Sequence, residues 1–119
     1  NGTATKDIAI NLYNLAIAHK RHGQFEEAQR ALELALNRAQ TLNDVGLTGR
    51  CYAQRGTIHV DAGRWMQAGA DYEQAMSRFN VINDVVGLAQ VKNHQAILYR
   101  LRGNHQRAEA STHKEDRRP

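Results

Sequence analysis

The sequence predicts an all-α fold of stacked antiparallel helix pairs, and three observations support this prediction. A six-residue motif recurs at a spacing of 40 residues, apolar side chains between its copies follow a helical period, and no segment shows the sustained two-residue alternation of a strand. A fixed period of about 20–50 residues indicates repeated units that cover one another's apolar faces. The single proline is Pro119, so no predicted helix is interrupted.

The repeated motif is a glycine, a ring two residues later and an alanine five residues after the glycine. Its copies span Gly23–Ala28, Gly63–Ala68 and Gly103–Ala108. Glycine tolerates the positive φ that often follows a helix C-terminus, so each copy should end one helix and begin another. Asn43-Asp44 and Asn83-Asp84 recur at the same period, and each aspartate is placed to cap the helix that follows it.

These signals predict one domain over residues 1–119. Its six helices are expected at about residues 4–22, 25–41, 45–62, 65–81, 85–102 and 105–115. They group into repeats at about 4–43, 44–83 and 84–115, and residues 113–119 form a polar tail. Trp65 should be substantially buried between the helices of its own repeat. Because the sequence starts at Asn1, we expect it to be part of a larger protein.

The repeated positions resemble the tetratricopeptide repeat, whose first helix carries large, large, small and aromatic residues and whose second carries spaced alanines. The first copy has Leu12, Leu15, Ala16, His19, Gly23, Phe25, Ala28, Leu32 and Ala35. The second has Tyr52, Arg55, Gly56, His59, Gly63, Trp65, Ala68, Tyr72 and Ala75. The third has Lys92, Gln95, Ala96, Tyr99, Gly103, His105 and Ala108, and then decays to Thr112 and Glu115.

This resemblance implies a right-handed superhelical stack of about three helix pairs, an α-solenoid. The period of 40 residues exceeds the usual 34 of the family, and the helix-ending proline of the family is absent. Both features are similar to the longer repeats of kinesin light chains, polarity adaptor proteins and bacterial regulatory proteins. Because these relatives bind proteins, the resemblance implies a protein-interaction module. The alternative is a sensor or self-assembly domain of a larger signalling protein or transcription regulator.

In the family, the first helix of each pair lines a concave groove. The groove implied here consists of Tyr13, Asn14, Ile17, Lys20, Arg21, Arg50, Gln54, Asn93, His94, Ile97 and Arg100, with Ile10, Ala53, Thr57, Asp61, Gln90 and Leu101 beside them. Basic residues outnumber acidic ones there, so we expect a protein or peptide partner that carries acidic groups or a C-terminal carboxylate. Two alternatives remain: the groove is ordinary solvated surface, or the parent protein's own segments fill it.

Composition disfavours membrane and nucleic-acid partners. No apolar run approaches the length of a membrane span, and a lone cysteine, Cys51, is typical of a reducing compartment, so we expect a cytoplasmic protein. Residues 1–90 carry nine basic and nine acidic side chains, whereas residues 91–119 carry seven and three. The net charge of +4 therefore belongs to one end of the chain, which lacks the interleaved aromatics of a nucleic-acid-binding surface.

No pattern in the sequence predicts an enzyme, a cofactor site or a metal site. His19 and His22 are correctly spaced to share a metal, but His19 occupies a packing position of the repeat and His59 recurs there. Cys51 has no nucleophile motif around it and is interpreted as a small packed side chain. The pair Glu26-Glu27 lies in the first turn of a helix, where the helix dipole favours negative charge.

The apolar face of the helix predicted at residues 85–102 should be only partly covered. Residues 105–115 contain only Ala108 and Ala110 as aliphatic side chains, so they offer little apolar cover to the preceding helix. That helix carries Val91, Ala96, Ile97, Leu98, Tyr99 and Leu101. We therefore expect some of these side chains to be exposed, a weak homodimer to form through this end, and residues beyond about 112 to be disordered.

Overall fold

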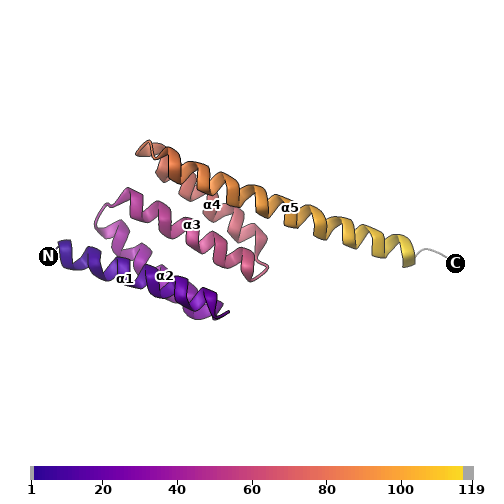
Figure 1. Cartoon of the computed structure of the whole chain (residues 1–119), viewed down its shortest axis with the longest axis horizontal. Helices are drawn as coiled ribbons and strands as arrows, with labels where there is room; N and C mark the ends of the chain where they lie inside the picture. The colour runs from indigo at the N-terminus through magenta and orange to yellow at the C-terminus, as the bar shows by residue number, and fades with distance from the viewer. Residues whose placement is uncertain (1, 117–119) are drawn as a thin grey trace.

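The computed structural model is helical throughout the part of the chain that it describes, which is the backbone of residues 2–116 and the side chains of residues 4–110. Five helices follow one another, and each runs antiparallel to the next and packs against it (Figure 1). They are α1 (Gly2–Arg21), α2 (Phe25–Thr41), α3 (Val45–Asp61), α4 (Trp65–Val81) and α5 (Val85–Asp116). The predicted all-α class is confirmed.

Each of the first four helices ends in the same three-residue turn. The residue with positive φ is Gly23 (74°), Asn43 (55°), Gly63 (77°) or Asn83 (54°). The next backbone N–H donates to the carbonyl five residues earlier, as from Gln24 to His19 at 2.9 Å and from Asp84 to Phe79 at 2.9 Å. This is the Schellman arrangement, and asparagine replaces glycine in it because it tolerates the left-handed conformation better than most residues.

The predicted aspartate caps are confirmed at the start of α3 and α5. The Oδ1 atom of Asp44 accepts the backbone N–H of Leu47 at 3.0 Å, and that of Asp84 accepts the backbone N–H of Gly87 at 2.9 Å. The bond from Leu47, followed by an ion pair with Lys6, holds the pKa of Asp44 below its ordinary value. Each cap stabilises its helix by about 1 kcal/mol.

The core consists of two clusters that share Tyr52 at their junction. The first lies between α1, α2 and α3, and its largest fully buried side chains are Leu32, Leu47 and Ile58. The second lies between α3, α4 and α5 and includes Tyr72, Phe79, Val91 and Leu98. The motif alanines Ala28 and Ala68 have no exposed surface, as expected where two helices approach closely.

Helix α3 contacts all four other helices, and its small residues make this possible. A Cβ atom added to Gly56 would lie 2.6 Å from the Tyr72 ring, and one added to Gly49 would lie 3.0 Å from the Phe79 ring. Side chains at these two positions would therefore push α3 away from α4.

The prediction of separate helices at 85–102 and 105–115 is wrong. Gly103 lies inside α5 and does not adopt the positive φ of Gly23 and Gly63. Folding back at Gly103 would bury little, because Thr112 and Asp116 occupy the positions where α2 has the buried Leu32 and Leu36. Continuing the helix adds a backbone hydrogen bond per residue without the cost of a new nucleus, so the third helix pair does not form.

The C-terminal half of α5 therefore extends past the other helices (Figure 1). The predicted polar tail begins inside this helix, which continues to Asp116, and residues 117–119 lie outside the described part of the chain. Trp65 is only half-buried, and its ring meets His105 of α5 edge-on at 5.1 Å between centroids. Tyr99 and Leu101 are exposed as expected, whereas Val91 and Leu98 are buried in the core.

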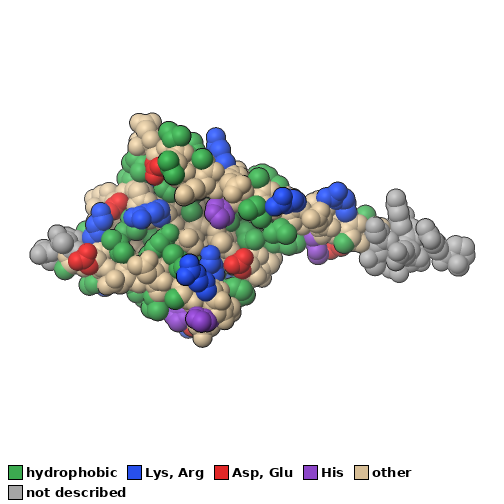
Figure 2. Space-filling model, viewed as in Figure 1, with side chains coloured by type: hydrophobic (Ala, Val, Ile, Leu, Met, Phe, Trp, Pro, Cys, Tyr) green, Lys and Arg blue, Asp and Glu red, His purple; other side chains and the backbone are tan. Residues whose placement is uncertain are grey.

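Figure 2 shows where exposed hydrophobic side chains gather: at the turn between α4 and α5, where Val81, Val85 and Val86 are at least two-thirds exposed. Basic side chains lie farther along α5 on the same face. Among the described residues, no helix combines the length and the apolar composition that a membrane span requires.

Gly23 and Gly103 occupy the same position in the repeated motif, but the structure predicts opposite effects of replacing them with alanine. Gly103→Ala should stabilise the chain by about 0.5–1 kcal/mol, because alanine favours a helix and a Cβ there meets nothing closer than 4.0 Å. Gly23→Ala should destabilise it by about 1 kcal/mol or more, because φ is +74°. Urea unfolding followed by circular dichroism measures both changes in stability. Equal destabilisation by the two variants would indicate that Gly103 also lies in a turn with positive φ.

Candidate functional site

A cavity of about 100 Å³ lies where α1, α3 and α5 converge. Helix α3 supplies Arg50, Ala53, Gln54 and Thr57, which share one face because they are spaced by three, four and seven residues. Tyr13 comes from α1. The remaining lining residues are Gln90, Val91 and His94 of α5 and Phe79 of α4.

Tyr13 and Arg50 form the polar rim of this cavity. The Arg50 guanidinium lies 5.9 Å from the centroid of the Tyr13 ring, a cation–π arrangement. Burial raises the pKa of Tyr13 above its ordinary value, although a hydrogen bond from Gln54 and the charge of Arg50 act in the opposite direction. The Tyr13 hydroxyl therefore keeps its proton at neutral pH and can donate a hydrogen bond.

The Gln54 side chain lines the cavity and hydrogen-bonds Tyr13, but one of its atoms lacks a partner. Its Oε1 atom is buried, and within the described part of the chain it is the one buried side-chain polar atom without a hydrogen bond. Native proteins leave few such atoms, since each costs about 1–3 kcal/mol.

His94 forms the wall of the cavity on α5. Its ring stacks on the Tyr72 ring, with centroids 6.1 Å apart and planes inclined by 25°. The Tyr72 hydroxyl lies 3.2 Å from the Thr57 hydroxyl, and burial raises the pKa of Tyr72. These contacts fix His94 through a side chain of the core, so this wall of the cavity is held in place.

The structure brings four of the eleven predicted groove residues around this cavity: Tyr13, Arg50, Gln54 and His94. The other seven lie outside it. Asn14, Arg21, Asn93 and Arg100 are exposed, whereas Ile17, Lys20 and Ile97 are half-buried. Phe79 also lines the cavity but was not predicted to do so, because the resemblance places only the first helix of each pair in the groove. Phe79 belongs to α4 and reaches the cavity by packing against Gly49 and Gly87.

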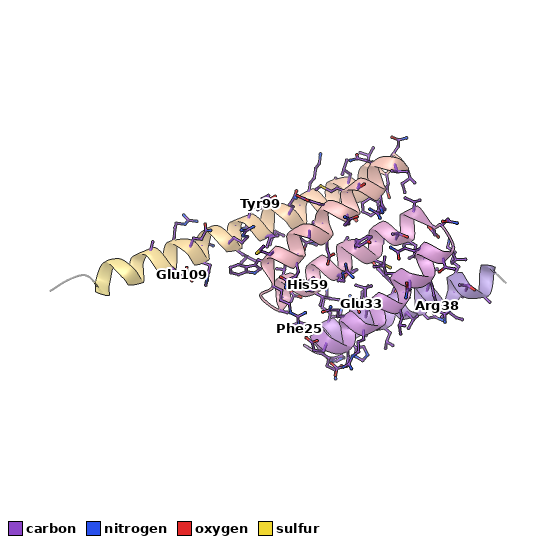
Figure 3. The ribbon with its side chains drawn as sticks, turned by 180° about the vertical axis from the view of Figure 1, so that it is seen from behind. Phe25, Glu33, Arg38, His59, Tyr99 and Glu109 are labelled. Atoms are coloured by element: carbon purple, nitrogen blue, oxygen red, sulfur yellow. The ribbon has the colours of Figure 1, made fainter. Side chains whose placement is uncertain are left out.

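A second polar cluster links α2, α3 and α4. Arg55 donates two hydrogen bonds to Asp71, from Nε and Nη2, each at 2.9 Å, and His59 Nε2 lies 3.5 Å from the same carboxylate. Arg64 pairs with Glu26 and donates to Gln29 of α2 at 2.7 Å. Figure 3 shows His59 and Glu33 among these helices. Asp71 and His59 are buried and paired, so this cluster joins α3 to α4 in the interior.

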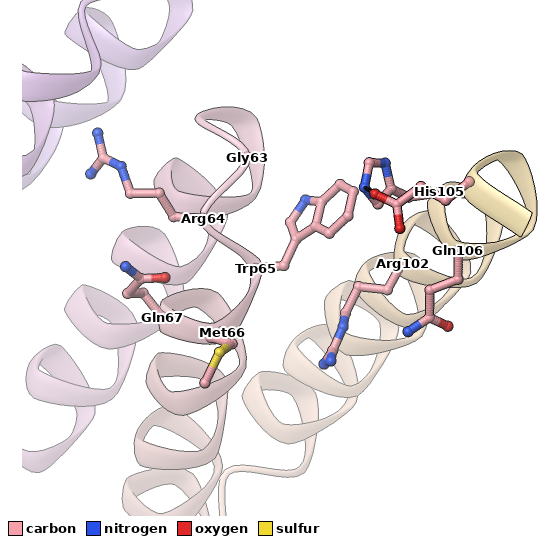
Figure 4. Close-up of a pocket in the computed structure, with 9 residues that line it drawn as sticks. Gly63, Arg64, Trp65, Met66, Gln67, Arg102, His105 and Gln106 are labelled. Carbon is pink, nitrogen blue, oxygen red and sulfur yellow. Dashed lines mark ion pairs between the residues drawn. The ribbon is translucent and has the colours of Figure 1, made fainter. Parts of the chain in front are cut away.

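A larger and more open cleft of about 540 Å³ lies between the start of α4 and the extended part of α5. In Figure 4 the Trp65 ring points toward His105, and Arg64 points away from both. His105 Nε2 lies 2.8 Å from Glu109 Oε1, and Met66 is 81% exposed. Sequence reasoning missed this cleft because it placed a turn at Gly103.

The structure gives the surroundings of His19 and Cys51, which the sequence analysis considered for metal binding and nucleophilic chemistry. Within residues 4–110, no three His, Cys, Asp or Glu side chains come together as a metal site would require. His19 Nδ1 lies 2.7 Å from Gln24 Oε1. Cys51 is fully buried, and burial raises its pKa to about 12, so its thiol remains protonated and unreactive.

A comparison with protein-family models found no match, and a comparison with curated proteins found no similar sequence.

The buried cluster predicts that stability decreases in mild acid. Burial, the largest effect, lowers the pKa of His59 below its ordinary value of 6.5, and Arg64 and Arg55 add to this, whereas Asp71 and Glu33 oppose it. Below about pH 6.5 the unfolded chain binds a proton that the folded chain rejects, so the free energy of unfolding falls by at most about 1.4 kcal/mol per pH unit.

Chemical denaturation between about pH 5 and pH 8 tests this, with His59→Gln as the comparison. The variant should lose part of the acid-induced decrease because glutamine does not titrate. Identical pH profiles for the two proteins would show that His59 does not contribute.

Proposed function

We propose that this chain is a protein-interaction module of the tetratricopeptide type, part of a superhelical array of helix pairs, and that it holds a partner peptide against α1, α3 and α5. The observation that carries the proposal is the cavity formed where these three helices meet, with hydrogen-bonding groups at its rim and buried side chains beneath. In support, α1 contacts α3 and α3 contacts α5, so the first helices of successive repeats lie next to one another.

The ligand we propose is an acidic peptide. Arg50 is exposed at the rim, with guanidinium donors that can bind a carboxylate in two-point fashion. Lys20 is half-buried, and Arg21 and Arg100 are exposed, on the flanking helices α1 and α5. We propose that a module of this kind acts in the cytoplasm, by presenting a fixed surface rather than by catalysis.

Binding of short peptides rich in Asp and Glu should map to α1, α3 and α5. Arg50→Ala should weaken the tightest of them by roughly ten- to a hundred-fold, the loss expected for a charged hydrogen bond worth about 1.5–3 kcal/mol. Arg38→Ala is the matched control, because Arg38 is an exposed arginine on α2 (Figure 3). Amide chemical-shift mapping identifies the helices involved, and shifts restricted to α2 and α4 would refute the proposal.

Self-assembly is the second candidate, and the exposed face of α5 favours it. The chain does not fold back at Gly103, so no second helix covers α5 as α2 covers α1. An exposed stripe results, consisting of Val85, Ala89, Lys92, Ala96 and Tyr99. A contiguous and largely apolar stripe of this kind is typical of an association surface.

Light scattering tests this candidate as a mass that rises with protein concentration. Tyr99→Glu should abolish association through α5, because it replaces the largest apolar side chain of the stripe with a charge. Leu34→Glu is the control: Leu34 on α2 is 55% exposed, close to the 57% of Tyr99. A constant monomer mass for the unaltered chain, or equal effects of both variants, would exclude association through α5.

A further inference from the structure

We propose that the outer face of α1 is a further association surface, through which two copies of this chain pair with their α1 helices antiparallel. This surface is separate from the stripe on α5, because α1 contacts only α2 and α3 and lies at the opposite edge of the row of helices from α5 (Figure 1). The pairing does not depend on peptide binding.

The surface is a stripe of four exposed side chains on α1: Ile8, Asn11, Leu15 and Ala18. They are spaced by three, four and three residues, the spacing of the seam along which one helix packs lengthwise against another. Ile8 is 43% exposed and Leu15 is 47% exposed, although both are large and apolar. Among the described residues, neither α2 nor α3 covers this stripe.

One repeat later, the same face of the helix is buried. The residues of α3 that follow Ile8, Asn11 and Ala18 by 40 positions are at most 5% exposed: Thr48, Cys51 and Ile58. Cys51 and Ile58 belong to the core cluster that α3 forms with α1 and α2. In this fold the face therefore accepts a neighbouring helix, and α1 presents it uncovered.

The charges beside the stripe select a second copy in the antiparallel orientation. Asp7 and Arg21 are exposed on the same side of α1, because the 14 residues that separate them are close to four helical turns. When two α1 helices pair antiparallel about a two-fold axis near Asn14, Asp7 of each copy faces Arg21 of the other. In the same register Ile8 faces the small Ala18 of the other copy, so the two helices can approach closely.

The parallel orientation would bring like charges together. It would place the last turn of α1, which carries His19, Lys20 and Arg21, beside the same turn of the second copy. It would also align the two helix dipoles. In the antiparallel pair the polar Asn11 faces Leu15 of the other copy, which costs free energy, so we expect a weak and reversible dimer.

Sedimentation equilibrium of the Tyr99→Glu variant tests the pairing without a contribution from α5. Its mass should rise toward that of two chains as the protein concentration increases. Asp7→Arg and Arg21→Asp, made in this background, should each raise the dimer dissociation constant about tenfold, because each replaces two attractive charge pairs with two repulsive ones. An equimolar mixture of the two variants should regain the original affinity, since each supplies the charge that the other lacks.

A constant monomer mass in the Tyr99→Glu background would overturn the proposal. Single charge variants that associate as their parent does, or a mixture that associates no better than its components, would do the same. Both substitutions lie at exposed positions, and circular dichroism of each variant confirms that the helices remain.

A seam variant and cysteine cross-linking test the contact itself. Leu15→Glu should abolish the dimer, whereas Leu34→Glu on α2, where Leu34 is 55% exposed, should not. Asn14→Cys lies beside the two-fold axis and should form an intermolecular disulfide, and the buried Cys51 does not compete with it. Ala18→Cys should not, because its two copies would be about 15 Å apart along the helices. Cross-linking through Ala18→Cys alone, or equal effects of the two leucine variants, would reject the antiparallel pair.

Discussion

The structure depends on how closely α3 can approach its neighbours. This helix touches each of the other four, and at two of its contacts with α4 it carries glycine. The Tyr72 ring packs against Gly56, and the Phe79 ring packs against Gly49. Gly87 of α5 lies against the same Phe79 ring, and an added Cβ there would be 3.0 Å from it, so one aromatic side chain joins α3, α4 and α5.

This close approach has a cost that packing must offset. Each glycine within a helix reduces its stability by about 0.5–1 kcal/mol relative to alanine, and α3 contains Gly46, Gly49 and Gly56. Helix α3 is therefore maintained by the rings packed against it rather than by its intrinsic propensity. The arrangement also positions the candidate site, because Arg50 and Gln54 belong to the helix that these contacts fix.

The local signals of the sequence predicted most of the fold, since turns and caps depend on a few adjacent residues. Asp44 and Asp84 cap the helices expected of them, and Gly23 and Gly63 end theirs. Gly103 shows the limit: glycine permits a left-handed turn but does not require one, and the outcome depended on the apolar surface available further along the chain. The cavity was only partly predictable for a similar reason, because the contribution of Phe79 depends on packing between helices distant in sequence.

The short turns affect how the chain folds and unfolds. Successive helices are joined by only three residues, and the extensive contacts link helices adjacent in sequence, so little loop entropy is lost before they form. Chains with such low contact order fold within microseconds to milliseconds. Helix α3 contacts four other helices, whereas each of the others contacts only two. Amide hydrogen exchange should therefore be slowest in α3 and become faster toward both ends of the chain. The free energy of opening would then change gradually along the chain instead of being the same for every helix.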